Sequence, residues 1–404
     1  MEVYVARQPI FDRMKRIYGY ELLFRGGMSN FFSGIDGDTA TSKVLSNSFL
    51  SIGMDNITGS KLAFVNFTQD LLLSGVPLMF PKEKVVVEIL ENVEPEDDVI
   101  DICRHIAGRG YCIALDDFFY RSSMDPLIAM ANIIKFDFRL TAMEEIEEYI
   151  TKLSDCNVKF LAEKVETHEE FKRAMQMGCD YFQGYFFSKP EVIKGKDFSG
   201  NQMNLLQIMA EVNKEDFKFN EVSKIITRDV SISYKLLRYI NSAYFGVYHD
   251  ISSIDQALAM LGEKGIRRFL SLIAMSELSC EKPNELMKTS IIRARFSEVI
   301  GESSGSHINS SELFTLGLFS LIDAILDDSM ENLMSRLPLS ENIKKALVYD
   351  EGELKDYLRL AVCYEMGDWN GVSDMAKVLG FNEEKLPDHF MEALTWADAM
   401  TSLE

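Results

Sequence analysis

Histidine and closely spaced cysteine pairs are scarce in this sequence. Its 404 residues include five histidines, at positions 105, 168, 249, 307 and 389, and none follows a predicted strand. The six cysteines form no C-x-x-C pair. Zinc centres are built from such residues, so a zinc site is disfavoured. The pattern instead predicts buried thiols in a reducing compartment, without disulfides.

Basic charge and long apolar runs are also lacking. The formal net charge is −21, and direct binding of DNA or RNA through a basic patch is therefore not expected. The most apolar stretch, 313–326, is interrupted by Ser320 and Asp323 and is too short to span a bilayer. The opening residues MEVYVARQP show no signal-peptide pattern. These absences predict a cytoplasmic protein without a membrane span.

The first half of the chain alternates between β-rich runs and helical patterns. The runs are near-continuously hydrophobic, which is typical of strands buried on both faces. Eight of them with intervening helices predict a TIM-like β/α barrel over residues 1–200. The first two are joined only by FDRMKR, too short for a helical crossover, so we expect one antiparallel strand. The predicted strands are 3–6, 17–24, 62–67, 85–90, 112–118, 133–137, 158–163 and 181–187.

The second half, residues 201–404, is predicted to be all-helical. FNEVSKIITRDVSISYKLLRYINSA carries apolar residues at helical spacing. SIDQALAMLG begins with Ser253 and Gln256 at capping-box spacing and is expected to end at Gly262. The polar, glycine-containing segment 193–201 is the expected linker. The fold class is therefore α/β plus all-α, in two domains.

Oxygen-bearing side chains stand at the ends of nearly all the predicted strands. In a β/α barrel the active site forms at the C-terminal ends of the strands. Clustered carboxylates raise one another's pKa unless cations are present, and Mg²⁺ or Mn²⁺ prefers such oxygen ligands. The residues at these ends are Glu21, Asn66, Glu88, Glu91, Asp116, Asp117, Lys135, Asp137, Glu163, Glu166 and Gln183.

Lys135 is the one cation in this set, and two roles are open for it. It could pair with Asp137 or another neighbour, or it could orient an attacking water and neutralise developing negative charge. Two metal ions about 4 Å apart with a lysine nearby suit in-line displacement at phosphorus. The residues alone thus predict metal-assisted hydrolysis of a phosphodiester.

The motifs of the first half, taken together, resemble the EAL domain of cyclic-di-GMP phosphodiesterases over nearly 190 residues. YELLFR (20–25) occupies the position of the Glu-Ala-Leu motif after which the family is named, with Leu22 in place of the alanine. The other matching segments are RQPIFD, VNFT, VEILE, LDDF, IKFD, AEKVET and FQGYFFSKP, in the order of the family.

The resemblance implies hydrolysis of cyclic di-GMP to linear pGpG with Mg²⁺ or Mn²⁺, in a site for two ions. The implied metal ligands are Glu21, Asn66, Glu88, Asp116, Asp117 and Glu163. The implied catalytic residues are Lys135, Glu21 and Glu166, and Gln8, Arg25 and Gln183 would contact the dinucleotide. Glu91 and Asp137 would support the ligands.

One loop and two single residues depart from the family pattern. The glycine-rich loop after Asp117 reads FYRSSMDPL, Leu90 replaces a threonine, and Lys164 replaces the glycine after Glu163. In the family that loop couples dimerisation to metal binding, so turnover and a homodimer are both left open. Lys164 could repel a metal ion or point away from the site.

The second half resembles the HDOD domain, a relative of HD phosphohydrolases, in ITRDVSISYKLLRYINSAYFG and ISSIDQALAMLGEKGIRRFL. Ser320 and Leu321 occupy the positions of the metal-binding His-Asp pair. The resemblance therefore implies a regulatory or protein-binding module whose partner the sequence does not identify. Three alternatives follow: a regulated phosphodiesterase, a cyclic-di-GMP receptor or adaptor that is catalytically impaired, and a scaffold that no longer binds the nucleotide.

Overall fold

The computed structural model describes residues 3–26, 54–188, 226, 230–242, 245, 251–278, 282–305, 307–337 and 339–401. The chain divides into two units, Met1–Phe187 with Tyr364–Trp369, and Ser188–Cys363 with Asn370–Glu404. The predicted linker at 193–201 and the predicted boundary after residue 200 lie outside the described residues.

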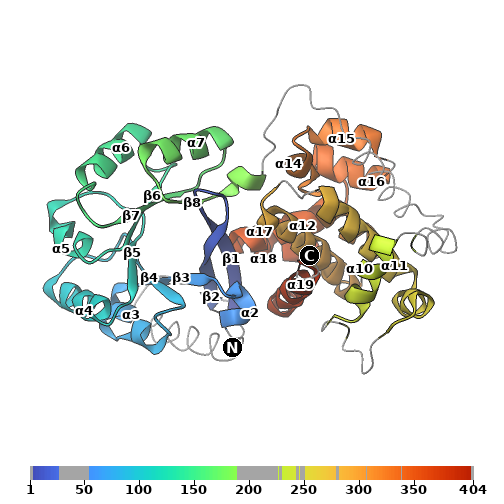
Figure 1. The fold of residues 1–404 in the computed structure, drawn as a ribbon, viewed down its shortest axis with the longest axis horizontal. Coiled ribbons are helices and arrows are strands. Elements are labelled where there is room, and N and C mark those ends of the chain that lie inside the picture. The colour runs from blue at the N-terminus through green and yellow to red at the C-terminus, as the bar shows by residue number, and fades with distance from the viewer. Residues whose placement is uncertain are drawn as a thin grey trace. The chain divides into compact units, whose positions relative to one another are not determined.

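Eight strands of the first unit close into a barrel in sequence order (Figure 1). β1 is antiparallel to both of its neighbours, β2 and β8, and every other neighbouring pair is parallel. The predicted barrel with one antiparallel strand is confirmed. The strands are β1 (Val3–Asp12), β2 (Ile17–Gly26), β3 (Leu62–Phe67), β4 (Val85–Ile89), β5 (Cys112–Leu115), β6 (Ile133–Asp137), β7 (Lys159–Glu163) and β8 (Tyr181–Gln183).

Helices lie around the outside of the barrel (Figure 1). Each longer helix buries one apolar stripe; α4, for example, buries Val99, Cys103 and Ile106 at helical spacing. α7 begins with a capping box made by Thr167 and Glu170. The helices are α2 (Met54–Thr58), α3 (Gln69–Leu73), α4 (Asp97–Gly108), α5 (Asp125–Ile128), α6 (Met143–Lys152) and α7 (His168–Met177), with 3₁₀ turns η2 (Val76–Met79), η3 (Ser122–Met124) and η4 (Tyr185–Ser188).

Two strands, β5 and β8, end several residues earlier than the hydrophobic pattern predicts. β5 ends at Leu115 instead of residue 118, and Asp117 then adopts a left-handed φ of 38°. β8 ends at Gln183 instead of residue 187, because Gly184 turns the chain with a φ of 139°. A Cβ at Gly184 would lie 2.2 Å from the Val165 carbonyl oxygen, so only glycine fits this close approach.

The described part of the second unit is helical, as predicted. α11 changes direction at Gly262, which has a φ of 61°, so the first of its two helical segments ends at the predicted residue. α12 is buried along most of its length and packs against α13 and α19. The helices are α10 (Val230–Ile240), α11 (Ile254–Leu278), α12 (Asn284–Ser303), α13 (Ser310–Phe319), α14 (Ile322–Leu326), α15 (Met330–Arg336), α16 (Glu341–Lys344), α17 (Leu354–Met366), α18 (Trp369–Val378) and α19 (Leu386–Thr401), with the short turns η5 (Lys345–Tyr349) and η6 (Glu383–Lys385).

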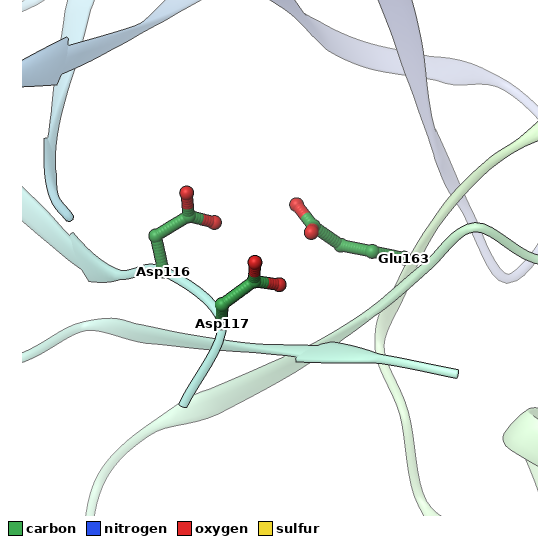
Figure 2. Close-up of side chains that lie close together, drawn as sticks. All are labelled: Asp116, Asp117 and Glu163. Carbon is green, nitrogen blue, oxygen red and sulfur yellow. The ribbon is translucent and has the colours of Figure 1, made fainter. Parts of the chain in front are cut away.

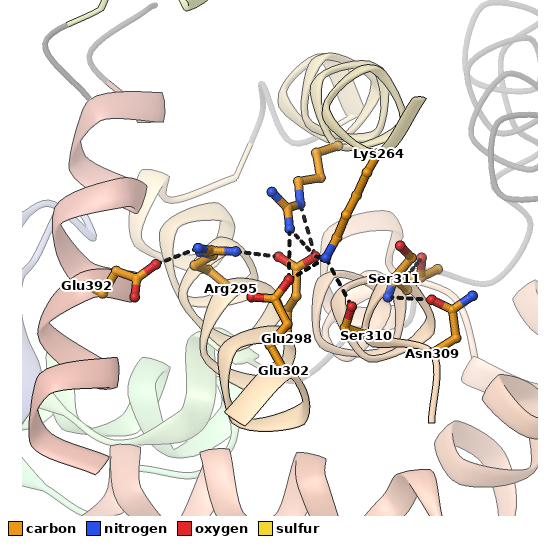
Figure 3. A network of polar contacts seen from close by, with 10 residues as sticks. Lys264, Arg295, Glu298, Glu302, Asn309, Ser310, Ser311 and Glu392 are labelled. Atoms are coloured by element: carbon orange, nitrogen blue, oxygen red, sulfur yellow. Dashed lines mark hydrogen bonds and ion pairs between the residues drawn. The ribbon is translucent and has the colours of Figure 1, made fainter. Parts of the chain in front are cut away.

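A fully buried carboxylate, Glu298 on α12, is the centre of a charge network in this unit (Figure 3). It pairs with Lys264 of α11 at 3.2 Å and with Arg295 at 2.8 Å, and also with Arg268 of α11. Arg295 in turn pairs with Glu392 of α19. The network thus connects three helices through three cations, Lys264, Arg268 and Arg295, and three carboxylates, Glu298, Glu302 and Glu392.

Replacement of Glu298 by alanine is expected to destabilise the helical unit, because it leaves three cations facing a buried gap. Removing one member of a buried ion pair costs about 3 kcal/mol. We expect the urea midpoint of unfolding, followed by far-UV circular dichroism, to fall accordingly. The matched control is Glu263→Ala, which removes an exposed i,i+4 pair with Arg267 on α11 and is expected to cost less than about 1 kcal/mol. Equal midpoint shifts in the two variants would contradict a special role for the buried network.

Candidate metal centre

Two layers of inward-facing side chains fill the barrel, and they differ in polarity. The lower layer is apolar and consists of Ile10, Phe64, Val86, Ala114, Ile133 and Leu161. Side chains alternate between the two faces of a strand, so the residue two positions further on faces the interior again. On β3 to β7 and the residues that directly follow them, these next positions are Asn66, Glu88, Asp116, Lys135 and Glu163.

The first two strands join the same upper layer in their own ways. β1 runs in the opposite direction, so its upper residue is Gln8, two positions before Ile10. On β2, Gly19 keeps the lower layer open, since a Cβ there would lie 2.9 Å from the Phe64 ring. Two positions later Glu21 enters the upper layer, where it is the register partner of Gln8.

Lys135 is the centre of the upper layer. Its side chain has no exposed surface. Its Nζ lies 2.7 Å from Glu88 Oε1 and 2.8 Å from Asp116 Oδ1. It also lies 2.5 Å from Glu163 Oε1 and 3.8 Å from Glu21 Oε2. Four carboxylates, each carried by a different strand or by the residue that directly follows it, therefore converge on one ammonium group.

Amide side chains fix the orientation of Glu21. Asn66 Nδ2 donates to Glu21 Oε1 at 3.0 Å, and Gln183 Nε2 donates to Glu21 Oε2 at 2.6 Å. Gln183 Nε2 also donates to Gln8 Oε1 at 3.0 Å. Both amides thus use their nitrogen atoms on this ring of residues, which leaves their oxygen atoms available for other partners.

A second group of carboxylates forms where Asp117 joins the layer (Figure 2). The carboxylates of Asp116, Asp117 and Glu163 face one another, and one oxygen atom of each lies within 4.8 Å of one oxygen atom of the other two. The left-handed turn at Asp117 is fixed to β6, because the next amide, Phe118 N–H, donates to the Lys135 carbonyl at 3.0 Å. Neighbouring aspartates that would alternate in a strand therefore both face the barrel axis.

Burial and mutual repulsion raise the pKa values of three carboxyl groups of this site, Asp117, Glu163 and Glu88. Burial, with help from Asp116, raises the pKa of Asp117 from 3.8 to about 6. Burial raises the pKa of Glu163 from 4.5 to about 8, although Lys135 acts in the opposite direction. The pKa of Glu88 is likewise raised by burial. Burial alone would lower the pKa of Lys135, but the surrounding carboxylates outweigh it and raise that pKa well above its usual value.

The donor set fits a hard divalent cation. Three buried oxygen atoms, Asn66 Oδ1, Glu88 Oε2 and Asp117 Oδ1, have no hydrogen-bond partner. Leaving such acceptors unpaired is costly in a buried site. They come from three neighbouring strands and lie among carboxylates whose charge exceeds that of Lys135. Mg²⁺ and Mn²⁺ satisfy both the oxygen atoms and the charge.

The supporting residues implied by the family pattern lie at the rim. Asp137 is buried, and its Oδ1 accepts backbone N–H bonds from Arg139 at 2.6 Å and Leu140 at 3.1 Å. Its other oxygen pairs with Lys164. Lys135 does not pair with Asp137, which was one of the alternatives for it. The Lys164–Asp137 pair was not predicted, since no sequence signal gives a lysine the left-handed φ of 53° that Lys164 adopts.

The remaining predicted site residues are outside this ring. Glu91 is exposed after β4. Glu166 has a side chain that is 48% exposed, and it pairs with Arg139 at 3.2 Å. The backbone of Arg25 pairs with Tyr4 of β1, but the Arg25 side chain lies outside the described residues.

Comparisons with known proteins identify relatives along the whole chain. The EAL domain model matches residues 49–190 and the HDOD domain model matches residues 202–338. The chain is 37% identical to cyclic di-GMP phosphodiesterase CdgJ of Vibrio cholerae, over 99% of this chain and 93% of that protein. It is 35% identical to the uncharacterized protein YuxH of Bacillus subtilis, over 98% of each.

Among solved structures, a standalone EAL protein of Vibrio cholerae in its c-di-GMP-bound form matches 46% of this chain and 92% of its own, with 26% identity and a TM-score of 0.37. Within the described residues, no helix combines the length and the apolar character that crossing a membrane requires.

The raised pKa values of two carboxyl groups predict how the stability of the metal-free protein depends on pH. The pKa values of Asp117, about 6, and Glu163, about 8, exceed their ordinary values of 3.8 and 4.5. At a pH between the ordinary and the raised pKa of each group, the folded state binds more protons than the unfolded state. The free energy of unfolding therefore falls as pH rises through this range. We expect a lower Tm at about pH 8 than at about pH 6, and a larger rise in Tm on adding Mn²⁺ at the higher pH.

The control for this pH dependence is Glu163→Gln, which removes one of the two titrating groups. The fall in Tm between the two pH values is expected to be smaller in this variant. A fall of the same size in both proteins would show that Glu163 does not carry the effect.

Proposed function

Because this chain belongs to the family of proteins that join an EAL domain to an HDOD domain, we propose that it hydrolyses cyclic di-GMP to linear pGpG with divalent metal ions. The observation that carries the proposal is the ring of four carboxylates around the buried Lys135, in a chain 37% identical to a cyclic di-GMP phosphodiesterase along nearly its whole length. In the reaction, water attacks one phosphorus atom and one ester P–O bond breaks, which opens the dinucleotide ring.

The metal ligands in this proposal are Glu21, Asn66, Glu88, Asp116, Asp117 and Glu163, and the ions are two Mg²⁺ or Mn²⁺. When bound, the ions supply charge neutralisation and a water of lowered pKa, which suits attack at phosphorus. The number of oxygen donors supports two ions, since Asp117 adds a further carboxylate beyond the four that surround Lys135.

The chain's own residues supply position and charge. Lys135 gathers carboxylates from separate strands into one layer, and its fixed ammonium is available to counter negative charge that develops on the phosphate. Gln183 and Asn66 keep Glu21 oriented. Gln8, Gln183 and Arg25 are the proposed contacts to the dinucleotide, and Glu166 is proposed as a catalytic residue together with Lys135 and Glu21.

The helical half is proposed to regulate the barrel through a protein partner. We place the boundary of the two domains after residue 200 and expect a cytoplasmic location. Ser320 supports a role without hydrolysis for this half, because its hydroxyl donates to the Gly317 carbonyl at 2.7 Å and accepts from Arg293 Nη1 at 3.3 Å. A helix-capping serine held in this way offers no ligand of the kind that an HD centre needs.

Purified protein incubated with cyclic di-GMP and Mn²⁺ is expected to produce pGpG, measured by chromatography of the nucleotides. Glu21→Ala is expected to reduce the rate by on the order of a hundredfold or more, because it removes a proposed metal ligand and the partner of two amides. The control is Glu144→Ala, an exposed residue on α6, which is expected to retain the wild-type rate.

Tight binding of cyclic di-GMP without pGpG would contradict the proposed hydrolysis and would identify a receptor instead. The absence of both binding and cleavage would contradict the nucleotide function altogether.

A further inference from the structure

Lys164 is a cation fixed at the edge of the metal centre. It directly follows Glu163, and Asp137, with which its ammonium pairs, is the register partner of Glu163 on the neighbouring strand. The Lys164 side chain is half-exposed along its length, but its tip reaches a carboxylate that is only 1% exposed. The lysine therefore neither points away from the centre nor joins the ring around Lys135.

The backbone at Lys164 makes this lysine unusual. Its φ of 53° lies in the left-handed region, which costs a non-glycine residue of order 1 kcal/mol or more. A glycine would adopt this conformation without that cost. The half-exposed stem of Lys164 gains little from packing that could offset this conformational cost. The interaction that the side chain makes is its ion pair with Asp137.

A second acidic residue, Asp117, is anchored to the strand that carries Asp137. The turn that carries Asp117 is fixed to β6 through the Phe118–Lys135 hydrogen bond, and Asp137 ends the same strand. The ammonium of Lys164 and the turn of Asp117 are therefore both held at the end of β6, next to the Asp116–Asp117–Glu163 group.

We propose that Lys164 is a tethered cation that weakens divalent-ion binding at the Asp116–Asp117–Glu163 group, so that the two proposed metal sites fill at different ion concentrations. The inference rests on the proposed metal-dependent function. Its consequence is that the ion site that includes Asp117 fills only at a higher ion concentration than the other site.

The test measures Mn²⁺ binding without nucleotide, by the electron paramagnetic resonance signal of free Mn²⁺ and by isothermal titration calorimetry. Wild-type protein is expected to show two classes of site. Lys164→Met, which keeps an unbranched stem, and Lys164→Gly, which suits the left-handed backbone, are each expected to strengthen the weaker class by about tenfold. Methionine keeps the cost of the left-handed backbone and glycine removes it, so the two variants together separate the loss of charge from any change in the turn.

Two control variants keep the relevant charge. Lys164→Arg retains a cation next to Asp137 and is expected to bind Mn²⁺ as the wild type does. Lys15→Met removes the lysine of the β1–β2 turn, whose φ of 57° is nearly the same, and is also expected to leave the isotherm unchanged. Circular dichroism of each variant checks the fold.

The possible outcomes separate this inference from the proposed function. Two Mn²⁺ sites of equal affinity in the wild type, or no gain in affinity in Lys164→Met and Lys164→Gly, would overturn the role of Lys164 and leave the metal centre intact. Weaker binding in those variants would also overturn it and would show that Lys164 only orders Asp137. If wild-type protein binds no Mn²⁺, this inference and the metal-dependent function fail together.

Discussion

The single ammonium of Lys135, surrounded by Glu21, Glu88, Asp116 and Glu163, is the constraint on which the barrel site depends. One positive charge cannot balance four carboxylates in a buried layer, and Asp117 adds a fifth nearby. The deficit must be made up by protons or by cations. In the absence of a metal ion, the excess of negative charge adds to the effect of burial and raises the pKa values of Glu163 and Asp117. The same imbalance is the driving force for binding a divalent ion.

The barrel creates this concentration of charge through simple strand geometry. Each inward position of the apolar layer is followed, two residues later, by a polar one, so separate strands deliver their side chains to one height. The antiparallel β1 obeys the same rule in reverse and contributes Gln8 from before Ile10. The apolar layer below fills the barrel under the charged side chains, and Phe64 occupies the space that Gly19 leaves. The same strands thus carry the apolar core in one layer and the candidate metal ligands in the next.

The eight strands, the reversed β1 and the convergence of acids at one end could be predicted because all three follow from hydrophobic runs, loop length and strand polarity. The ends of β5 and β8 were missed because the hydrophobic runs continue past the left-handed residues Asp117 and Gly184 that end these strands; at β8 the glycine itself was the available signal. The partner of Asp137 was equally inaccessible. Lys135 is close to Asp137 in the sequence, and Lys164 follows the register partner of Asp137 on the next strand. The left-handed turn at Lys164 is what brings that lysine, and not Lys135, to Asp137.

A buried charge does not by itself mark a functional site, as the helical unit shows. Glu298 is as deeply buried as Lys135, yet its network contains three cations and three carboxylates and needs nothing further. Such a balanced network can contribute to the packing of α11, α12 and α19. The ring around Lys135 has the same kind of contacts but an excess of negative charge and several oxygen atoms without hydrogen-bond partners. The difference in charge balance, more than burial or the number of ion pairs, separates the structural network from the site that requires a cation.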